Sequence, residues 1–244
     1  MAETGPLSTF DAKQIRVLAF DVFGTVVDWR TSIAREVDAL GLGVDAERFA
    51  DAWRAGYQPA MQRVRSGALG WTKIDALHRM ILDDVLQRFG IAARLDEAAR
   101  ADLNRAWHRL DAWPDAAAAI ERLKRRYTVV TLSNGNIGLL TAMAKRAGLA
   151  WDAVLSAEVF RHYKPDPQAY LGVCEVFDIE PGAMLMCAAH PDDLRAAAAC
   201  GCRTAYIDRP LEFGPAGRSR HAPAAGAFDL DTTDMNDLAA QLGC

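Results

Sequence analysis

The stretch RVLAFDVFGTVVDWR, residues 16–30, combines a strand, a glycine turn and the start of a helix. Its opening apolar run is typical of a strand that is buried on both faces, and Gly24 marks the turn after it. Asp21 stands where the strand ends, and Phe23 follows two residues later. Parallel sheets bind ligands outside the carboxyl ends of their strands. Asp21 is therefore the first candidate for a functional residue.

From residue 113 onward, helical patterns alternate with short apolar runs. Strands separated by helices imply right-handed crossovers and a parallel sheet, and the strand before Asp21 belongs to the same sheet. The sequence therefore predicts an α/β fold with a Rossmann-like parallel-sheet core formed by residues 14–29 and 113–244. The further strands that we expect are YTVVTLS (127–133), AVLSA (153–157), AMLMCAA (183–189) and RTAYI (203–207).

Residues 30–112 are predicted to form a helical cap domain inserted after the first strand. Apolar residues recur there at helical spacing in four stripes, and Asp28 is the expected N-cap of the first helix. The stripes are Ile33, Val37 and Leu40; Phe49, Trp53, Tyr57, Met61 and Val64; Ile74, Leu77, Ile81, Val85 and Phe89; and Leu103, Trp107 and Leu110. Residues 1–13 are expected to be a loose tail, and residues 209–228 a surface loop.

Composition restricts the function classes. The 244 residues are 51% hydrophobic with a net charge of -4, which indicates a globular protein and disfavours nucleic acid or an anionic membrane as the main partner. No apolar run approaches the ~18 residues of a membrane span, and the N-terminus lacks the pattern of a signal peptide. Five cysteines without a CxxC pair are typical of reduced thiols, so we expect a cytoplasmic protein.

Polar motifs stand at four successive strand ends. Asp21 begins D-x-x-G-T, Ser133-Asn134 follows the second strand, Lys164-Pro165 comes after the third, and Asp192-Asp193 after the fourth. Each motif alone has little specificity, but the four in this order resemble the haloacid dehalogenase superfamily over nearly the whole chain.

The resemblance is to one branch of that superfamily. Its phosphatases carry D-x-D and a Gly-Asp pair that together bind magnesium, whereas this chain has Phe23 and Ala188-Ala189 at those positions. A magnesium site would lack oxygen ligands, and a phenyl ring supplies no proton to a leaving alcohol. The pattern instead resembles the type II L-2-haloacid dehalogenases, which implies a small 2-haloacid substrate, no metal and no cofactor.

This resemblance implies a role for each matching residue. Asp21 would be the nucleophile that displaces halide and forms an ester. Halide leaves without a proton, so Phe23 can line an apolar pocket with Val22 instead of providing an acid. Lys164 would keep Asp21 ionised, and Asp193 would help to activate water.

The resemblance also assigns residues to substrate binding. Arg54 and Asn134 would receive the departing halide. Ser133, with backbone N–H groups of the first turn, would bind the substrate carboxylate, while Thr25 and Tyr170 would support the site by hydrogen bonding.

One motif departs from the family pattern. Members often have Ser-x-Asn where this chain has Ala188-Ala189-His190. His190 either replaces the Asn by hydrogen bonding near Asp21 or reshapes the pocket for a smaller halogen. Ala188 also removes a hydroxyl from the surroundings of Lys164.

Two other hypotheses stay open. A magnesium phosphatase would need a second metal carboxylate, for which Asp192 is the best candidate. A non-catalytic binding module would be expected to lose Asp21 or Lys164. Taken singly, the polar residues also have structural explanations: Asp21 as a turn former, Arg54 as an exposed arginine on a helix flank, Lys164 as a loop lysine, Asp193 as an acid in a first helical turn, and His190 as an N-cap. The apolar stripes of the cap make a homodimer plausible.

Overall fold

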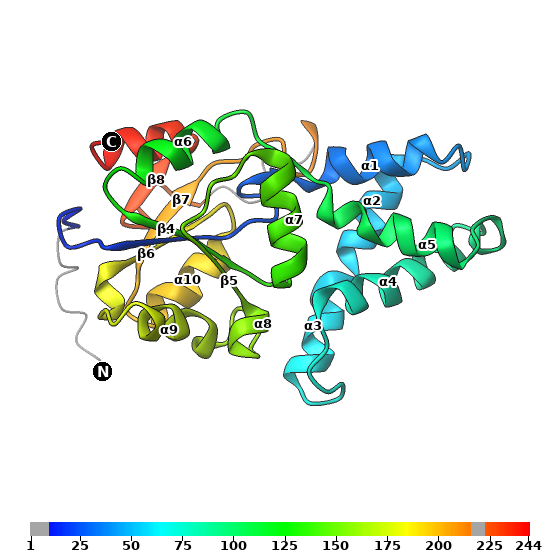
Figure 1. The fold of residues 1–244 in the computed structure, drawn as a ribbon, viewed down its shortest axis with the longest axis horizontal. Helices are drawn as coiled ribbons and strands as arrows, with labels where there is room; N and C mark the ends of the chain where they lie inside the picture. The colour runs from blue at the N-terminus through cyan, green and yellow to red at the C-terminus, as the bar shows by residue number, and fades with distance from the viewer. Residues whose placement is uncertain (1–9, 216–222) are drawn as a thin grey trace.

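The core of the protein is a six-stranded parallel sheet (Figure 1). The computed structural model describes residues 10–215 and 223–244. The strand order is β5-β4-β1-β6-β7-β8, so β1 lies in the middle of the sheet and pairs with both β4 and β6. The strands are β1 (Val17–Phe20), β4 (Thr128–Ser133), β5 (Ala153–Ser156), β6 (Met184–Ala188), β7 (Arg203–Ile207) and β8 (Leu230–Thr232).

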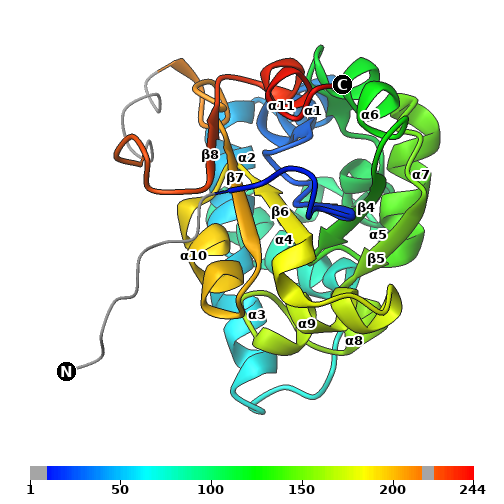
Figure 2. The same ribbon diagram turned by 90° about the vertical axis from the view of Figure 1, so that its left-hand side faces the viewer.

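Helices cover both faces of this sheet, as the two perpendicular views show (Figures 1 and 2). One face carries α6 (Ala116–Leu123), α7 (Ile137–Ala147) and α11 (Met235–Gln241); the other carries α9 (Pro167–Val176) and α10 (Pro191–Ala199), and the short α8 (Ala157–Phe160) follows β5. All four residues of β1 are buried, as expected for a central strand covered on both faces. The predicted α/β fold is confirmed.

A helical insertion leaves and re-enters the sheet domain through one short ribbon. The ribbon is an antiparallel pair of β2 (Val27–Asp28) and β3 (Asp111–Ala112). Between them lie α1 (Trp29–Ala39), α2 (Ala46–Ala55), α3 (Tyr57–Arg65), α4 (Ile74–Arg88) and α5 (Glu97–Asn104), with 3₁₀ turns at Ala92–Arg94 and Arg105–His108. Because the ribbon follows the Asp21 turn directly, the insertion stands over the carboxyl ends of the strands.

Two helical predictions differ from the structure in detail. Asp28 does cap α1, accepting a hydrogen bond from the Thr31 N–H at 3.0 Å. The second stripe, however, is two helices that meet at Gly56, where an added Cβ would lie 2.3 Å from the Ile81 side chain. The close approach of α4 therefore requires glycine at this position, and Pro59, in the first turn of α3, prevents one continuous helix because it has no backbone N–H to donate to the preceding turn. The fourth stripe begins earlier than predicted, at α5, whose N-cap is Asp96.

The predicted tail and surface loop also need correction. Residues 1–9 and 216–222 lie outside the described residues. Phe10 is half-buried against the core, and the Tyr127 hydroxyl lies 3.4 Å from the carbonyl oxygen of Ala12, so residues 10–13 are not a loose tail. In the predicted surface loop, Glu212 is only 3% exposed. The short polar elements β8 and α11 escaped sequence analysis.

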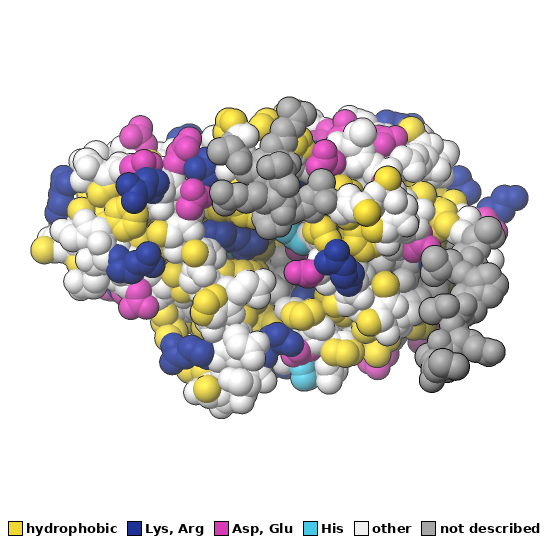
Figure 3. All heavy atoms as spheres, turned by 180° about the vertical axis from the view of Figure 1, so that it is seen from behind, with side chains coloured by type: hydrophobic (Ala, Val, Ile, Leu, Met, Phe, Trp, Pro, Cys, Tyr) yellow, Lys and Arg dark blue, Asp and Glu magenta, His cyan; other side chains and the backbone are white. Residues whose placement is uncertain are grey.

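The distribution of charged side chains on the surface agrees with the modest net charge of the protein. In the face shown in Figure 3, basic and acidic side chains are interspersed and no broad basic field is visible. Within the described residues, no helix has the length and apolar character needed to cross a membrane.

Candidate active site

Asp21 lies at the centre of a buried polar cluster at the carboxyl end of β1. Its side chain is 10% exposed, and its backbone N–H donates to the Cys187 carbonyl oxygen at 3.0 Å. Asp21 Oδ1 accepts a hydrogen bond from Lys164 Nζ at 3.0 Å. Oδ2 accepts one from the Thr25 hydroxyl at 2.9 Å and lies 3.1 Å from His190 Nδ1. The nucleophile that the resemblance implies is therefore held by three donors.

The charges around Asp21 keep it ionised. Burial by itself would raise the pKa of the Asp21 carboxyl, but the positive charges of Lys164 and His190 hold that pKa well below its ordinary value. Burial would likewise lower the pKa of Lys164, yet the carboxylates of Asp193 and Asp21 raise it. At neutral pH the cluster thus contains an ammonium group between two carboxylates.

Lys164 connects Asp21 to Asp193. Its Nζ lies 2.5 Å from Asp193 Oδ2, and the Tyr170 hydroxyl donates to Asp193 Oδ1 at 2.6 Å. The backbone of Lys164 is fixed by the Asn134 side chain, which accepts from its N–H at 2.7 Å and donates to its carbonyl oxygen at 3.3 Å. Residues from the turn after β4, from α9 and from α10 together thus determine where the ammonium group lies.

His190 belongs to a second chain of contacts that ends at Glu212. His190 Nε2 lies 3.0 and 3.1 Å from the two carboxylate oxygens of Glu212, and the Trp29 indole N–H donates to Glu212 Oε1 at 3.0 Å. Burial would lower the pKa of His190, but Glu212 and Asp21 raise it to about 10. His190 occupies the N-cap position of α10, yet its side chain makes no capping hydrogen bond.

Sequence analysis missed Glu212 because no motif surrounds it. The feature that marks Glu212 is the close approach of its carboxylate to Gly24, which exists only in the folded chain. Gly24 has φ +86°, and a Cβ added there would lie 2.1 Å from Glu212 Oε1. The glycine of the first motif therefore leaves room for a carboxylate that arrives from a distant segment.

The other predicted residues surround this cluster without all touching Asp21. Val22 and Phe23 are buried, and the Phe23 ring packs edge-on against Tyr57, His78 and Trp107 of the insertion. Ser133 accepts a hydrogen bond from the Gly135 N–H at 3.1 Å, so its hydroxyl orders its own turn. Phe23 thus forms an apolar junction between the first turn and the helical insertion.

Arg54 reaches the same junction from α2. Its guanidinium carbon lies 4.3 Å from the centre of the Tyr57 ring and 5.5 Å from that of Trp29. Its Nη1 is buried and has no hydrogen-bond partner among the described residues. A buried donor without a partner is costly and is suited to receive an anion. Tyr57, treated in sequence analysis as cap core, lies against this cation.

Asp192 is remote from this cluster. Its side chain is 97% exposed and pairs with Arg195 at 2.7 Å, one turn along α10. In residues 10–215 and 223–244, no group of three or more His, Cys, Asp or Glu side chains is arranged to hold a metal ion. The second metal carboxylate that a phosphatase would need is therefore not supplied by Asp192.

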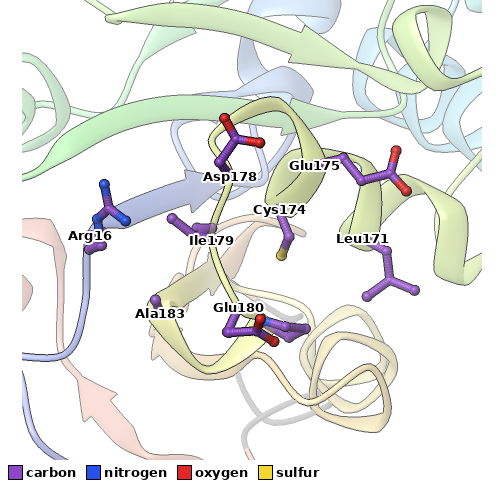
Figure 4. Close-up of a pocket in the computed structure, with 9 residues that line it drawn as sticks. Arg16, Leu171, Cys174, Glu175, Asp178, Ile179, Glu180 and Ala183 are labelled. Carbon is purple, nitrogen blue, oxygen red and sulfur yellow. The ribbon is translucent and has the colours of Figure 1, made fainter.

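A separate surface pocket lies at the opposite edge of the sheet (Figure 4). Arg16, which precedes β1, and Glu180, which precedes β6, line it together with Cys174 of α9. Because these residues lie at the amino ends of the strands, this pocket has no contact with Asp21.

The fold and this cluster define a class of hydrolase. The family model of the haloacid dehalogenase-like hydrolases matches residues 15–201, and the chain belongs to that family.

Individual relatives are more specific. The chain is 31% identical over 205 residues to (S)-2-haloacid dehalogenase 1 of Pseudomonas sp. (strain CBS-3), covering 82% of this chain and 88% of the relative. The structure of a defluorinating L-2-haloacid dehalogenase matches with a TM-score of 0.89 at 46% identity, over 94% of this chain and 96% of that one. The L-2-haloacid dehalogenase of Xanthobacter autotrophicus with chloropropionic acid covalently bound matches with a TM-score of 0.81 at 26% identity, over 93% and 98%.

Proposed function

We propose that the protein hydrolyses short (S)-2-haloacids, that is L-2-haloacids, to D-2-hydroxyacids through an ester on Asp21. The observation that carries this proposal is the buried, ionised carboxylate of Asp21 beside Phe23, which stands at the position where the phosphatases of this superfamily have their second acid. The names of the relatives, which are dehalogenases of 2-haloacids, support the same substrate class.

The first step is a displacement at carbon. A carboxylate oxygen of Asp21 attacks C2 of the substrate, and the C–X bond breaks with both electrons leaving on the halide. Lys164 keeps the carboxylate ionised, and Val22 and Phe23 provide an apolar wall. Arg54 and Asn134 are proposed to receive the halide, and Ser133 with backbone N–H groups of the first turn the substrate carboxylate. For Arg54, the support is its unpaired buried Nη1.

The second step hydrolyses the ester. Asp193 is proposed to accept a proton from water, whose oxygen then attacks the Asp21 carboxyl carbon. Tyr170 and Lys164, which both contact Asp193, hold it next to the reacting carboxyl group. One proton per turnover is released to solvent with the halide.

One assay distinguishes the candidate functions. Purified protein is given L-2-chloropropionate or p-nitrophenyl phosphate, each with and without EDTA, and released chloride and phosphate are measured. We expect chloride only. Phosphate release that depends on magnesium would favour the phosphatase, and neither product would favour a non-catalytic binding module.

The covalent route has its own test. In a single turnover with excess enzyme in H₂¹⁸O, the label is expected in Asp21 and not in the hydroxyacid. Mass spectrometry of the Asp21 peptide and the product reads this directly. If water instead attacked the substrate carbon, with Asp21 or Asp193 as the base, the first product would carry the label and the peptide none. Asp21→Asn is expected to be inactive by either route.

Two further properties are proposed. A cytoplasmic location is supported by the five cysteines, which are all free. A homodimer is supported by two exposed apolar side chains on the helical insertion, Leu40 and Met80. Light scattering after gel filtration measures the mass of the assembly, and a monomer would contradict the second proposal.

A further inference from the structure

The two oxygens of the Asp21 carboxylate are held differently. A carboxylate oxygen has about two acceptor sites. Oδ2 uses both, one for the Thr25 hydroxyl and one for His190, whereas Oδ1 uses one, for Lys164. Only Oδ1 therefore keeps an acceptor site that is free of the contacts made by these three residues.

We propose that Asp21 attacks through Oδ1, and that Thr25 and His190 form an oxyanion hole for Oδ2 during ester hydrolysis, with Glu212 as the positioning residue that keeps His190 a donor. This inference rests on the proposed function. It gives His190 a task distinct from accepting a proton from water, and it gives a task to Glu212, which no motif marks.

The bonds balance under this assignment. In the first step the Oδ1–C2 bond forms and the C–X bond breaks, so Cγ=Oδ2 becomes the carbonyl of the ester. Water then adds to Cγ, its proton goes to Asp193, and the π electrons move onto Oδ2. When Cγ=Oδ2 re-forms, the Cγ–Oδ1 bond breaks and the hydroxyacid leaves with Oδ1. One proton is transferred to that hydroxyl and one is released.

The donors on Oδ2 are in place before charge develops there. Thr25 is itself fixed, because its hydroxyl accepts a hydrogen bond from the Ala189 N–H at 2.9 Å. His190 lies between two carboxylates, and only a doubly protonated ring donates to both. Preorganised donors aimed at a developing oxyanion are usually worth ~10²–10³ in rate each.

Glu212 matters most after the ester has formed, because alkylation removes the negative charge of Asp21. Of the charged groups around His190, Asp21 and Glu212 face it directly, and Lys164 and Asp193 lie beyond Asp21. Arg54 helps to keep Glu212 ionised, since its charge adds to that of His190 in lowering the pKa of Glu212 against the effect of burial. Glu212 is thus the carboxylate that still faces His190 in the ester.

The alternative is that His190 acts as the base for water, and the two roles predict opposite dependence on pH. A donor must be protonated, so ester hydrolysis falls as pH rises through the pKa of His190. A base must be deprotonated, so hydrolysis rises through the same pKa. Glu212→Gln lowers the pKa of His190, so the fall in rate that a donor predicts, or the rise that a base predicts, should occur at lower pH than in wild type.

The experiment follows both steps in Glu212→Gln by rapid quench, with L-2-chloropropionate as substrate. Chloride reports alkylation, and intact-protein mass reports the lactyl ester. We expect one equivalent of chloride in a burst, accumulation of ester, and hydrolysis about tenfold slower near pH 8, with the falling limb at lower pH than in wild type. Asp208→Asn is the matched control: it removes a carboxylate in the same segment, one that accepts a hydrogen bond from the Tyr206 hydroxyl and is not in contact with His190.

Two further variants test the oxyanion hole itself. Thr25→Val should slow hydrolysis more than the chloride burst, because Thr25 binds the oxygen that does not attack. In His190→Asn, the amide is a donor that does not titrate, so hydrolysis should be slower but without the alkaline fall.

Specific results would overturn the inference. These are wild-type hydrolysis in Glu212→Gln, hydrolysis that rises with pH, a permanent ester in His190→Asn, or equal slowing of both steps in Thr25→Val. If wild-type protein forms no ester and releases no chloride, the proposed function itself fails.

Discussion

Phe23 shows how a single residue separates two chemistries on one fold. It stands two positions after Asp21, where the phosphatases of this superfamily have their second acid, and its ring packs against Tyr57 and Trp107 of the insertion. A halide needs no proton when it leaves. An aromatic ring at this position therefore removes a function that the proposed reaction does not use, and it seals the junction against water.

Arg54 provides a direct test at the residue scale. In Arg54→Met the side chain keeps most of its apolar stem and loses its charge. Because loss of one donor to a developing anion usually costs ~10²–10³ in kcat, chloride release should fall by about that factor. Arg48→Ala, on the exposed face of α2, should release chloride at the wild-type rate.

Stability should be measured alongside turnover. The melting temperature of Arg54→Met is expected to be at or above that of wild type, since Nη1 is buried without a partner among the described residues. Wild-type turnover in Arg54→Met would place the halide elsewhere.

His190 makes the stability of the protein depend on pH. Glu212 and Asp21, acting against burial, raise its pKa from 6.5 to about 10. The stability that this ring contributes is therefore fully present below pH 6.5 and is lost as pH rises through about 10. Urea unfolding of wild type and His190→Asn at several pH values between these limits should show a gap that narrows as pH rises. A gap that widens would mean that the ring is neutral in the folded protein.

The site residues that could be predicted from the sequence are those that belong to the motifs at the strand ends. Asp21, Lys164, His190 and Asp193 each follow a strand of the parallel sheet, so their meeting at one edge follows from topology. Glu212 and Tyr57 lie in no such pattern. Their places depend on how a distant loop and a helix pack, which spacing alone does not determine.

At the scale of elements, the packing of α4 buries a histidine whose ring nitrogens lack a hydrogen-bond partner among the described residues. His78 is 1% exposed and stacks on Trp107 with ring centres 4.3 Å apart, and neither ring nitrogen has a hydrogen-bond partner among the described residues. Burial lowers its pKa to about 3. The unfolded chain therefore binds a proton near pH 6.5 that the folded chain rejects, which destabilises the fold as pH drops from there.

Replacing this ring should stabilise the protein, most of all in acid. His78→Phe keeps an aromatic ring of similar size and removes two unsatisfied polar atoms. Its free energy of unfolding, from urea titrations, should equal or exceed that of wild type near pH 8 and exceed it further near pH 5. Met80→Leu, on the exposed side of α4, is the control. A loss of stability at both pH values would show that His78 has a partner in solution.

Helices and strands could be predicted from the sequence where their apolar residues form a clear pattern. The strands of the core agree with the sequence pattern because their burial is set by one sheet, and α1 agrees because one of its faces packs on α2. The need for glycine between α2 and α3 depends on the contact of Gly56 with Ile81 of α4, and the short β8 and α11 bury few side chains. Such features arise from packing between elements, which a periodicity within one element does not contain.

At the scale of the whole molecule, the arrangement of charges predicts independence of metal. Lys164 Nζ lies 3.0 Å from Asp21 and 2.5 Å from Asp193, so a cation of the protein itself is already paired with both carboxylates. Chloride release should be unchanged after dialysis against EDTA. Activity that disappears with EDTA and returns with magnesium would contradict the charge balance described here.

The contact between Trp29 and Glu212 joins positions 183 residues apart, and this has a consequence for biosynthesis. At ~5–20 residues per second, the ribosome needs roughly 10–40 s to proceed from the one to the other. During that interval Asp21, the proposed nucleophile, has been made but Glu212, the partner of His190, has not. The emerging polypeptide therefore cannot complete the proposed catalytic cycle. The His190–Glu212 pair, which is proposed to promote hydrolysis of the ester on Asp21, is complete only near the end of translation.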